Sequence, residues 1–128
     1  MADAIVDSDV LIDVLRGASG RSEALAQYAL GEQLAVTTVS MFEILCGART
    51  PRDRERVFQL VADFEVLELD TASATDAAHA WLETRAAGTP VDTGDLLIAG
   101  IARAAQLPLI TRNLKDFGRI SGLKLLEI

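Results

Sequence analysis

Short apolar segments alternate with segments of helical spacing along this chain, and that order restricts the fold more than any other feature. Residues 4–6, 34–37, 65–69 and 107–111 are short and apolar, as is typical of strands buried on both faces of a sheet. Residues 123–127 are expected to add an edge strand. Strands that alternate with helices form parallel sheets with helices on both faces. The order therefore predicts a three-layer α/β fold with a central, mostly parallel sheet of four or five strands.

The segments between these strands have the spacing of amphipathic helices. The first begins at Ser8, where the apolar residues follow an i, i+1, i+4 pattern, and stops at Gly17. Further helices are predicted over residues 22–31, 39–48, 51–64, 72–87 and 93–106. Three large aromatic residues, Phe64, Trp81 and Phe117, are expected to anchor the core.

Length and composition indicate a single domain over residues 1–128. Half of the residues are hydrophobic and 24% are charged, as in a compact folded chain rather than a disordered one. No apolar run approaches the ~20 residues of a membrane helix, so no membrane contact is expected. The single cysteine, Cys46, cannot form an internal disulfide, and we expect a cytoplasmic location.

The net charge of −7 argues against broad, nonspecific binding to nucleic acid. It leaves room for a nucleic-acid substrate if several of the acids surround cations. A local exception is a group of four arginines, Arg49, Arg52, Arg54 and Arg56. They are interpreted either as a solvated helix start of mixed charge or as a patch that guides phosphates.

Two acids, Asp7 and Asp9, directly follow the first predicted strand. Either Ser8 or Asp9 can cap the helix that begins here, but capping needs one side chain and leaves an acid over. In open parallel sheets, functional sites form outside the carboxyl ends of the strands. Asp7 is therefore predicted to lie at the edge where a site is expected.

Glu43 and Asp95 each have a structural explanation when they are considered alone. Ser40 and Glu43 have the S-x-x-E spacing of a capping box. Asp92 or Thr93 can cap the helix that follows them. Asp95 would lie in the first turn of that helix, where the helix dipole stabilises an acid.

Considered together, three acids point to a metal site. Asp7 ends the first strand, Glu43 begins the helix after the second, and Asp95 begins the helix before the fourth. If these strands are neighbours, the carboxylates converge at one end of the sheet, where their mutual repulsion favours protonation. A divalent cation removes that repulsion, and oxygen ligands suit Mg²⁺ or Mn²⁺.

Four motifs, in this order, resemble the PIN-domain ribonucleases, and most closely the VapC-type toxins of toxin–antitoxin pairs. They are IVDSDVLID at residues 5–13, VSMFEI at 39–44, DLLIAG at 95–100 and LITRNLKDF at 109–117. The likeness extends from Ile5 to the C-terminus. It implies a PIN-like fold and a Mg²⁺- or Mn²⁺-dependent endoribonuclease that hydrolyses RNA phosphodiester bonds.

The resemblance also implies which residues bind the metal and perform catalysis. The family's acidic ligands fall on three residues of this chain, namely Asp7, Glu43 and Asp95. Asn113 stands at the family's fourth acidic position and can ligate through its carbonyl oxygen without adding charge. Asp9, where the family often has asparagine, and Asp116 are therefore further candidate ligands, with Asp92 a weaker one.

Neighbouring polar residues have candidate roles of their own. Thr111 and Ser40 can hydrogen-bond the ligands or a phosphate. Arg112 can contact the backbone of the RNA strand, or it can be a solvated loop arginine.

The resemblance implies protein partners as well. These are an antitoxin with a segment that covers the site, often with a basic residue among the acids, and a second copy of the chain in a homodimer. A groove between residues 10–15 and 57–64 would suit an amphipathic helix from a partner. Ordinary core packing explains the same apolar residues.

Two other functions stay open at this level. IVDSDVLI also matches the D-x-D strand end of haloacid-dehalogenase-like phosphatases, in which Asp7 would be the nucleophile. That class needs a basic residue ahead of its late acidic motif, whereas the only lysines here, Lys115 and Lys124, follow Asp95. The second alternative is a PIN-like module that binds RNA or a partner without cutting, and Asn113 motivates it.

Overall fold

The computed structural model describes residues 1–18 and 20–128, and its centre is one sheet of five strands in the order β3-β2-β1-β4-β5. The strands are β1 (Ala4–Val6), β2 (Leu34–Thr37), β3 (Glu65–Leu67), β4 (Leu109–Thr111) and β5 (Leu125–Glu127). Every pairing between neighbours is parallel. The predicted α/β class is confirmed. The two strands that flank β1 are β2 and β4, which was the condition for the acids to converge.

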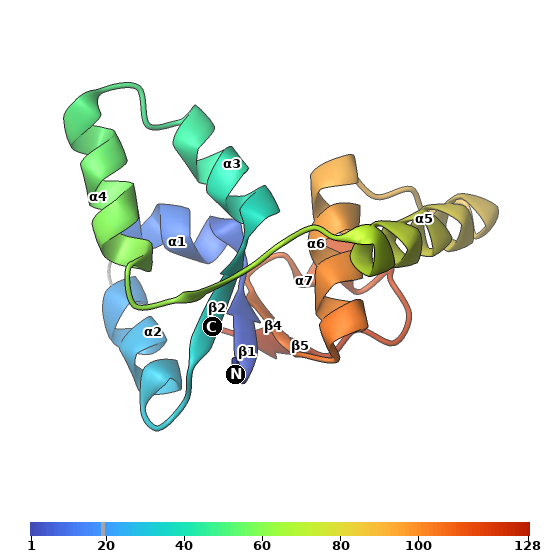
Figure 1. Ribbon diagram of the computed structural model, residues 1–128. Coiled ribbons are helices and arrows are strands. Elements are labelled where there is room, and N and C mark those ends of the chain that lie inside the picture. The colour runs from blue at the N-terminus through green and yellow to red at the C-terminus, as the bar shows by residue number, and fades with distance from the viewer. Residues whose placement is uncertain (19) are drawn as a thin grey trace.

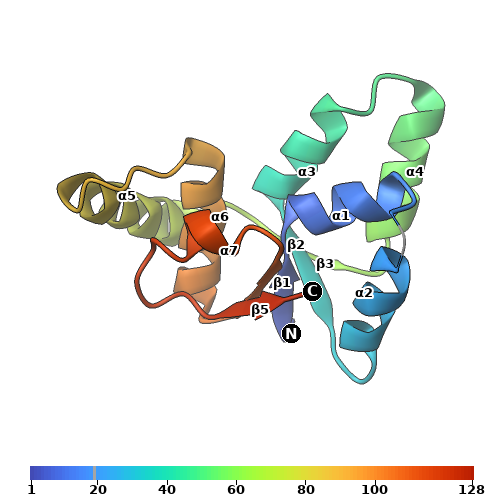
Figure 2. The ribbon, with the colours of Figure 1, turned by 180° about the vertical axis from the view of Figure 1, so that it is seen from behind.

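Helices cover both faces of the sheet and make three layers. They are α1 (Ser8–Leu15), α2 (Arg21–Ala29), α3 (Thr38–Cys46), α4 (Pro51–Val61), α5 (Thr71–Ala86), α6 (Thr93–Ala105) and α7 (Leu114–Phe117). Figure 1 shows α1–α4 on one side of the sheet and α5–α7 on the other, and Figure 2 shows the same division from behind. None of the helices in the described part of the chain combines the length and apolar character needed to cross a bilayer.

The core consists of two apolar clusters, one on each face of the sheet. Ile5 belongs to the cluster under α5–α7, whereas Ala4 and Val6 belong to the cluster under α1–α4. This alternation follows from the two-residue period of a strand. Because both sets of side chains are buried, all three residues of β1 are apolar, and the first polar residue comes where the strand ends.

Two of the three predicted aromatic anchors pack in this core, and the third does not. Phe117 is fully buried, and Phe64 is half-buried against the cluster under α1–α4. Trp81 is 43% exposed, with the Arg85 guanidinium 4.5 Å from the centre of its ring, so its prediction as a core residue is wrong. α5 meets α6 through small residues, which leave no space for an indole.

The start of α3 also differs from the predicted one. Thr37, the last residue of β2, caps the helix, because its hydroxyl accepts the backbone N–H of Ser40 at 3.0 Å. The capping box predicted for Ser40 and Glu43 is therefore wrong, and Glu43 lies in the second turn of the helix. At α6, Asp92 is the residue before the helix, but its side chain makes no capping bond.

The close contact between α5 and α6 generates a stability prediction. A Cβ at Gly100 would lie 2.5 Å from the Ser73 carbonyl oxygen and 2.8 Å from the Ala77 Cβ. Overpacking of this kind destabilises by about 1–3 kcal/mol, so Gly100→Ala should lower the free energy of unfolding in urea by that amount. Gly47→Ala is the matched control, because its Cβ would make an ordinary 3.6 Å contact, and it should change stability by less than about 0.5 kcal/mol. Equal losses in both variants would contradict this account of the packing.

Candidate functional site

Asp7 lies where β1 ends and α1 begins, and it is 3% exposed. Its Oδ1 accepts the backbone N–H of Ser8 at 2.8 Å, so Asp7 itself caps α1, and the prediction of Ser8 or Asp9 as the cap is wrong. Its Oδ2 accepts the Thr111 hydroxyl at 2.8 Å, from the end of the neighbouring strand β4. Two strand ends therefore hold this carboxylate in place.

Burial raises the pKa of Asp7 to about 8, from an ordinary value of 3.8. The neighbouring charges of Asp9 and Asp95 raise the pKa as well, whereas the hydrogen bond from Thr111 lowers it. A buried carboxylate of this kind takes up a proton or a cation.

Asp9 lies in the first turn of α1, and one of its oxygens lacks a partner. Its Oδ2 accepts the backbone N–H of Arg112 at 3.3 Å. Its Oδ1 is buried and makes no hydrogen bond to any residue of the described chain. A buried acceptor without a donor is unfavourable, and a cation is one group that can satisfy it.

Glu43 reaches the same region from α3. Its Oε1 accepts the Ser8 hydroxyl at 3.0 Å. A Cβ at Gly94 would lie 2.8 Å from its Oε2, so the carboxylate lies directly against the first turn of α6. The absence of a side chain at Gly94 is what admits Glu43 to this position.

Asp95, in the first turn of α6, is half-buried, and burial raises its pKa to about 6. The charges that raise it further are those of Glu43, Asp116, Asp92 and Asp9. Its Oδ2 accepts the side-chain amide of Asn113 at 3.4 Å, and the same amide donates to Asp116 at 3.2 Å. Asn113 thus lies between two carboxylates, and its own carbonyl oxygen accepts the Asp116 backbone N–H.

These groups fit a divalent cation that retains part of its water shell. Among residues 1–18 and 20–128, no three His, Cys, Asp or Glu side chains are grouped so that they hold a metal ion by themselves. Mg²⁺ does not need such a group, since it usually keeps several waters and takes one or two carboxylates together with substrate phosphates. The raised pKa values of Asp7 and Asp95 and the unpartnered Asp9 oxygen indicate an excess of negative charge that such an ion neutralises.

Not every residue singled out in the sequence joins this cluster. Ser40 is buried, and its Oγ accepts the Thr37 hydroxyl at 3.2 Å, so its observed partner is the α3 cap and not a carboxylate. Arg112 is exposed beside the cluster, and its Nε lies 2.7 Å from Asp13.

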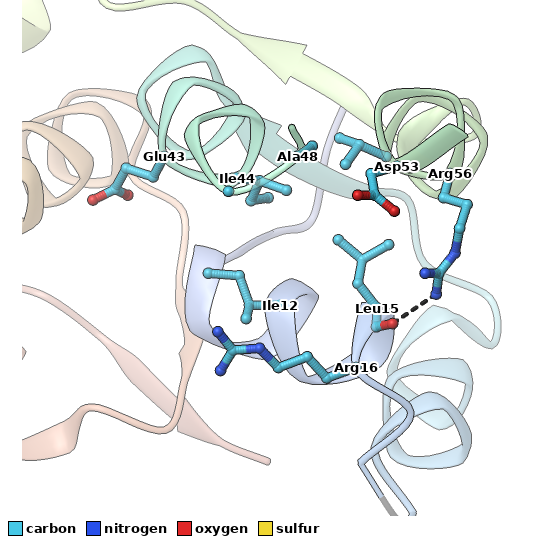
Figure 3. A pocket seen from close by; sticks show the side chains of 10 residues that line it. Ile12, Leu15, Arg16, Glu43, Ile44, Ala48, Asp53 and Arg56 are labelled. Carbon is cyan, nitrogen blue, oxygen red and sulfur yellow. Dashed lines mark hydrogen bonds between the residues drawn. The ribbon is translucent and has the colours of Figure 1, made fainter. Parts of the chain in front are cut away.

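A cavity of about 250 Å³ lies next to Glu43, between α1, α3 and α4. Figure 3 shows Ile12 and Leu15 of α1 facing Ile44 of α3, with Arg56 of α4 hydrogen-bonded to the Leu15 carbonyl oxygen. The groove expected between residues 10–15 and 57–64 is thus present in part, with α3 as a further wall. All four clustered arginines are exposed, and Arg56 also lines this cavity.

Sequence reasoning missed three residues that shape the site, namely Ser8, Asp13 and Gly94. Ser8 joins Asp7 to Glu43, because its backbone N–H donates to one and its hydroxyl to the other. Asp13 follows Asp9 by four residues in one helix, and this spacing was the available signal, since it puts both acids on one face. Nothing in the local sequence indicated that Gly94 makes room for Glu43.

Comparison with known protein families matches residues 4–123 to the PIN domain. Ribonuclease VapC10 from Mycobacterium tuberculosis is 35% identical to this chain over 120 residues, which cover 94% of the chain and 90% of the relative. The tRNA(fMet)-specific endonuclease VapC from Shigella flexneri is 31% identical over 96 residues, which cover 72% and 73%. Among solved structures, DNA-bound VapBC from Salmonella typhimurium aligns with a TM-score of 0.86 and 26% identity, covering 99% of this chain and 98% of the other.

The raised pKa values predict an unusual dependence of stability on pH. Without metal, Asp7 and Asp95 keep a proton in the folded state at pH values where the unfolded chain, with a pKa of 3.8, has released it. Unfolding therefore releases protons. The contribution of Asp7 and Asp95 to the free energy of unfolding falls as pH rises from about 4 to about 8. Thermal unfolding in EDTA between pH 5 and 8 should show this loss. Each pKa unit corresponds to about 1.4 kcal/mol.

Asp7→Asn tests the cause of this pH dependence, because it removes the carboxyl group with the larger of the two pKa shifts. This variant should lose less stability between pH 5 and 8 than the unmodified protein, and it should be the more stable of the two at pH 8. Asp63→Asn, which changes an exposed acid ahead of β3, should follow the unmodified protein. The same pH dependence in Asp7→Asn as in the unmodified protein would show that Asp7 is charged when folded.

Proposed function

Because this chain belongs to the PIN-domain family, we propose that it is a VapC-type ribonuclease, the toxin of a toxin–antitoxin pair, that hydrolyses RNA phosphodiester bonds. The observation that carries the proposal is the group of carboxylates at the carboxyl edge of the sheet, two of them with raised pKa values. The names ribonuclease and endonuclease, which similar proteins carry, support the same reaction.

We assign the metal ligands to Asp7 and Asp95, with Glu43 as the third acid and Mg²⁺ or Mn²⁺ as the ion. Asp9 and Asn113 are additional oxygen donors, as is Asp116. A divalent cation supplies a water of lowered pKa and offsets the negative charge that develops on the phosphate. All three principal ligands are then catalytic residues.

Other side chains keep these ligands oriented. The Thr111 hydroxyl holds Asp7, and the Ser8 hydroxyl holds Glu43. The amide of Asn113 donates to Asp95 and Asp116, which separates two acids that otherwise repel each other. Asparagine suits this role because its amide supplies hydrogen-bond donors. An aspartate in its place would add a further negative charge and no donor.

The cavity between α1, α3 and α4 is our candidate for the antitoxin contact. The solved structures similar to this chain include VapBC from Salmonella typhimurium. An amphipathic segment laid on Ile12, Leu15 and Ile44 would bring a basic side chain within reach of Glu43. We further propose that the whole chain forms one domain, and that it works in the cytoplasm as a homodimer.

Of the two alternatives, the phosphatase with Asp7 as nucleophile fails, because the chain belongs to a family with different chemistry. A module that binds RNA without cutting is an outcome of the experiment below.

The test is cleavage of unfractionated tRNA and of a mixed structured RNA pool by the purified protein with Mg²⁺, with Mn²⁺ or with EDTA. Cutting should require the metal. Asp95→Asn should reduce the rate by at least about 100-fold, because it removes a charged ligand at the ion. Asp63→Asn, prepared identically, should cut normally. Binding without cutting would favour the non-cleaving module, and undiminished cutting by Asp95→Asn would refute the assigned site.

A second prediction concerns the metal without RNA. Mg²⁺ or Mn²⁺ should raise the melting temperature at pH 8, because the ion binds the folded protein and takes the place of the proton on the carboxylates. Asp7→Asn should show little of this increase. An equal increase in both proteins would mean that the ion binds elsewhere.

A further inference from the structure

Arg112 is fixed at two points beside the carboxylates. It follows Thr111, the residue that holds Asp7, and its own backbone N–H donates to Asp9 at 3.3 Å. Its side-chain Nε lies 2.7 Å from Oδ2 of Asp13. The side chain is nevertheless 45% exposed, and its closest contact with Asp13 is made through Nε rather than through a terminal nitrogen.

Asp13 is in turn held from its other side. It lies one turn after Asp9 on α1, and its side chain is only 15% exposed. The same Oδ2 lies 3.3 Å from Nε of Arg21, an ion-pair contact without hydrogen-bond geometry. Arg21 also donates to the backbone oxygen of Ile128 at 2.9 Å, so α1, α2 and the end of β5 all contribute to the position of Asp13.

The ion pair with Asp13 affects how Arg112 can interact with the nearby carboxylates. An arginine next to several carboxylates is attracted to them, and if its side chain lay across them it would occupy the place of a cation. Asp13, one turn further along α1 than Asp9, instead binds the guanidinium through Nε. The terminal nitrogens remain available as a fork that matches two oxygens of a phosphate.

We infer that Asp13 is a positioning residue that holds Arg112 as a phosphate-binding fork for the RNA strand that enters the carboxylate site. The inference rests on the proposed ribonuclease function, and it adds Asp13, with Arg21 behind it, to the residues that determine RNA affinity.

The test is the effect of Asp13→Asn on RNA affinity. If Asp13 were only a surface acid, its neutralisation would remove a repulsive charge and tighten the binding of RNA. If it positions Arg112, neutralisation should instead raise KM for unfractionated tRNA by about 5- to 10-fold, with kcat within about 2-fold of the unmodified protein. Asp13→Glu, which keeps the carboxylate, should recover part of the loss. The two hypotheses therefore predict opposite changes in RNA affinity for Asp13→Asn.

Asp76→Asn is the matched control. It breaks an ion pair of similar length, 2.8 Å from Asp76 to Nε of Arg103, which joins α5 to the last turn of α6. Its KM should be unchanged. Melting temperatures of all variants identify any that are unfolded.

Arg112→Ala distinguishes contact from positioning. It should raise KM at least as much as Asp13→Asn does, and it should reduce the slope of log affinity against log salt by about 0.7, the value for one phosphate contact on a single strand. Adding Asp13→Asn to Arg112→Ala should cause no further loss, because the two residues act as one unit. An additive double variant would overturn the proposal.

The controls separate this inference from the function on which it rests. If the unmodified protein cuts RNA and Asp13→Asn binds it as well or better, the positioning role is wrong and the ribonuclease stands. If the unmodified protein binds tRNA without cutting, the same comparison of dissociation constants with Mg²⁺ present decides the role of Asp13. If it neither binds nor cuts RNA, both proposals fall.

Discussion

The charge of the buried Asp7 carboxylate is the constraint on which the rest of the site depends. A carboxylate at the end of a central strand cannot be solvated by bulk water, and Asp9 and Asp95 add further negative charge nearby. Hydrogen bonds from Ser8 and Thr111 offset only part of that cost, since the pKa still rises to about 8. The free protein therefore holds a proton where a working site would hold a cation. A site of this kind is stable in two states, and the exchange between them links metal binding to pH.

The fold supplies this charge cluster through its strand order. β1 lies between β2 and β4, so three chain segments that are distant in sequence end at one edge. Asp7 follows β1 directly, α3 follows β2 and carries Glu43, and Thr111 ends β4. α6 approaches from the opposite face and contributes Asp95 at its N-terminal turn, where the helix dipole favours an acid. Each of these residues therefore comes from a different element, and only the complete fold brings them together.

Much of this could be predicted from the sequence because it depends on local rules. The apolar length of Ala4–Val6, with an acid after it, predicted both a buried strand and the edge at which a site forms. The local rules failed where a neighbouring residue offered a different helix cap, and where a residue distant in sequence determined the position of a side chain. The spacing of Ser40 and Glu43 predicted a capping box, but the helix begins earlier, where Thr37 at the end of β2 caps it. Trp81 was predicted to be a core residue, but α5 and α6 pack through small residues and leave Trp81 exposed. The Ser8 bond to Glu43 and the Asp13 bond to Arg112 span 35 and 99 residues, and no spacing rule reaches that far.

A chain with a net charge of −7 has to attract a polyanion in order to act on RNA, and the positive charges are placed accordingly. Long-range attraction cannot come from the chain as a whole, so it has to come from local groups and from the bound cation itself. The exposed arginines include Arg112 and the group Arg49, Arg52, Arg54 and Arg56, of which Arg56 also lines the cavity beside Glu43. In the proposed function, the negative cluster that repels RNA when empty would bind a phosphate once it holds a cation. If the proposed metal site is right, affinity for RNA depends on whether the site holds its cation, and a basic side chain from a partner that occupies the carboxylates would remove both metal and RNA in one step.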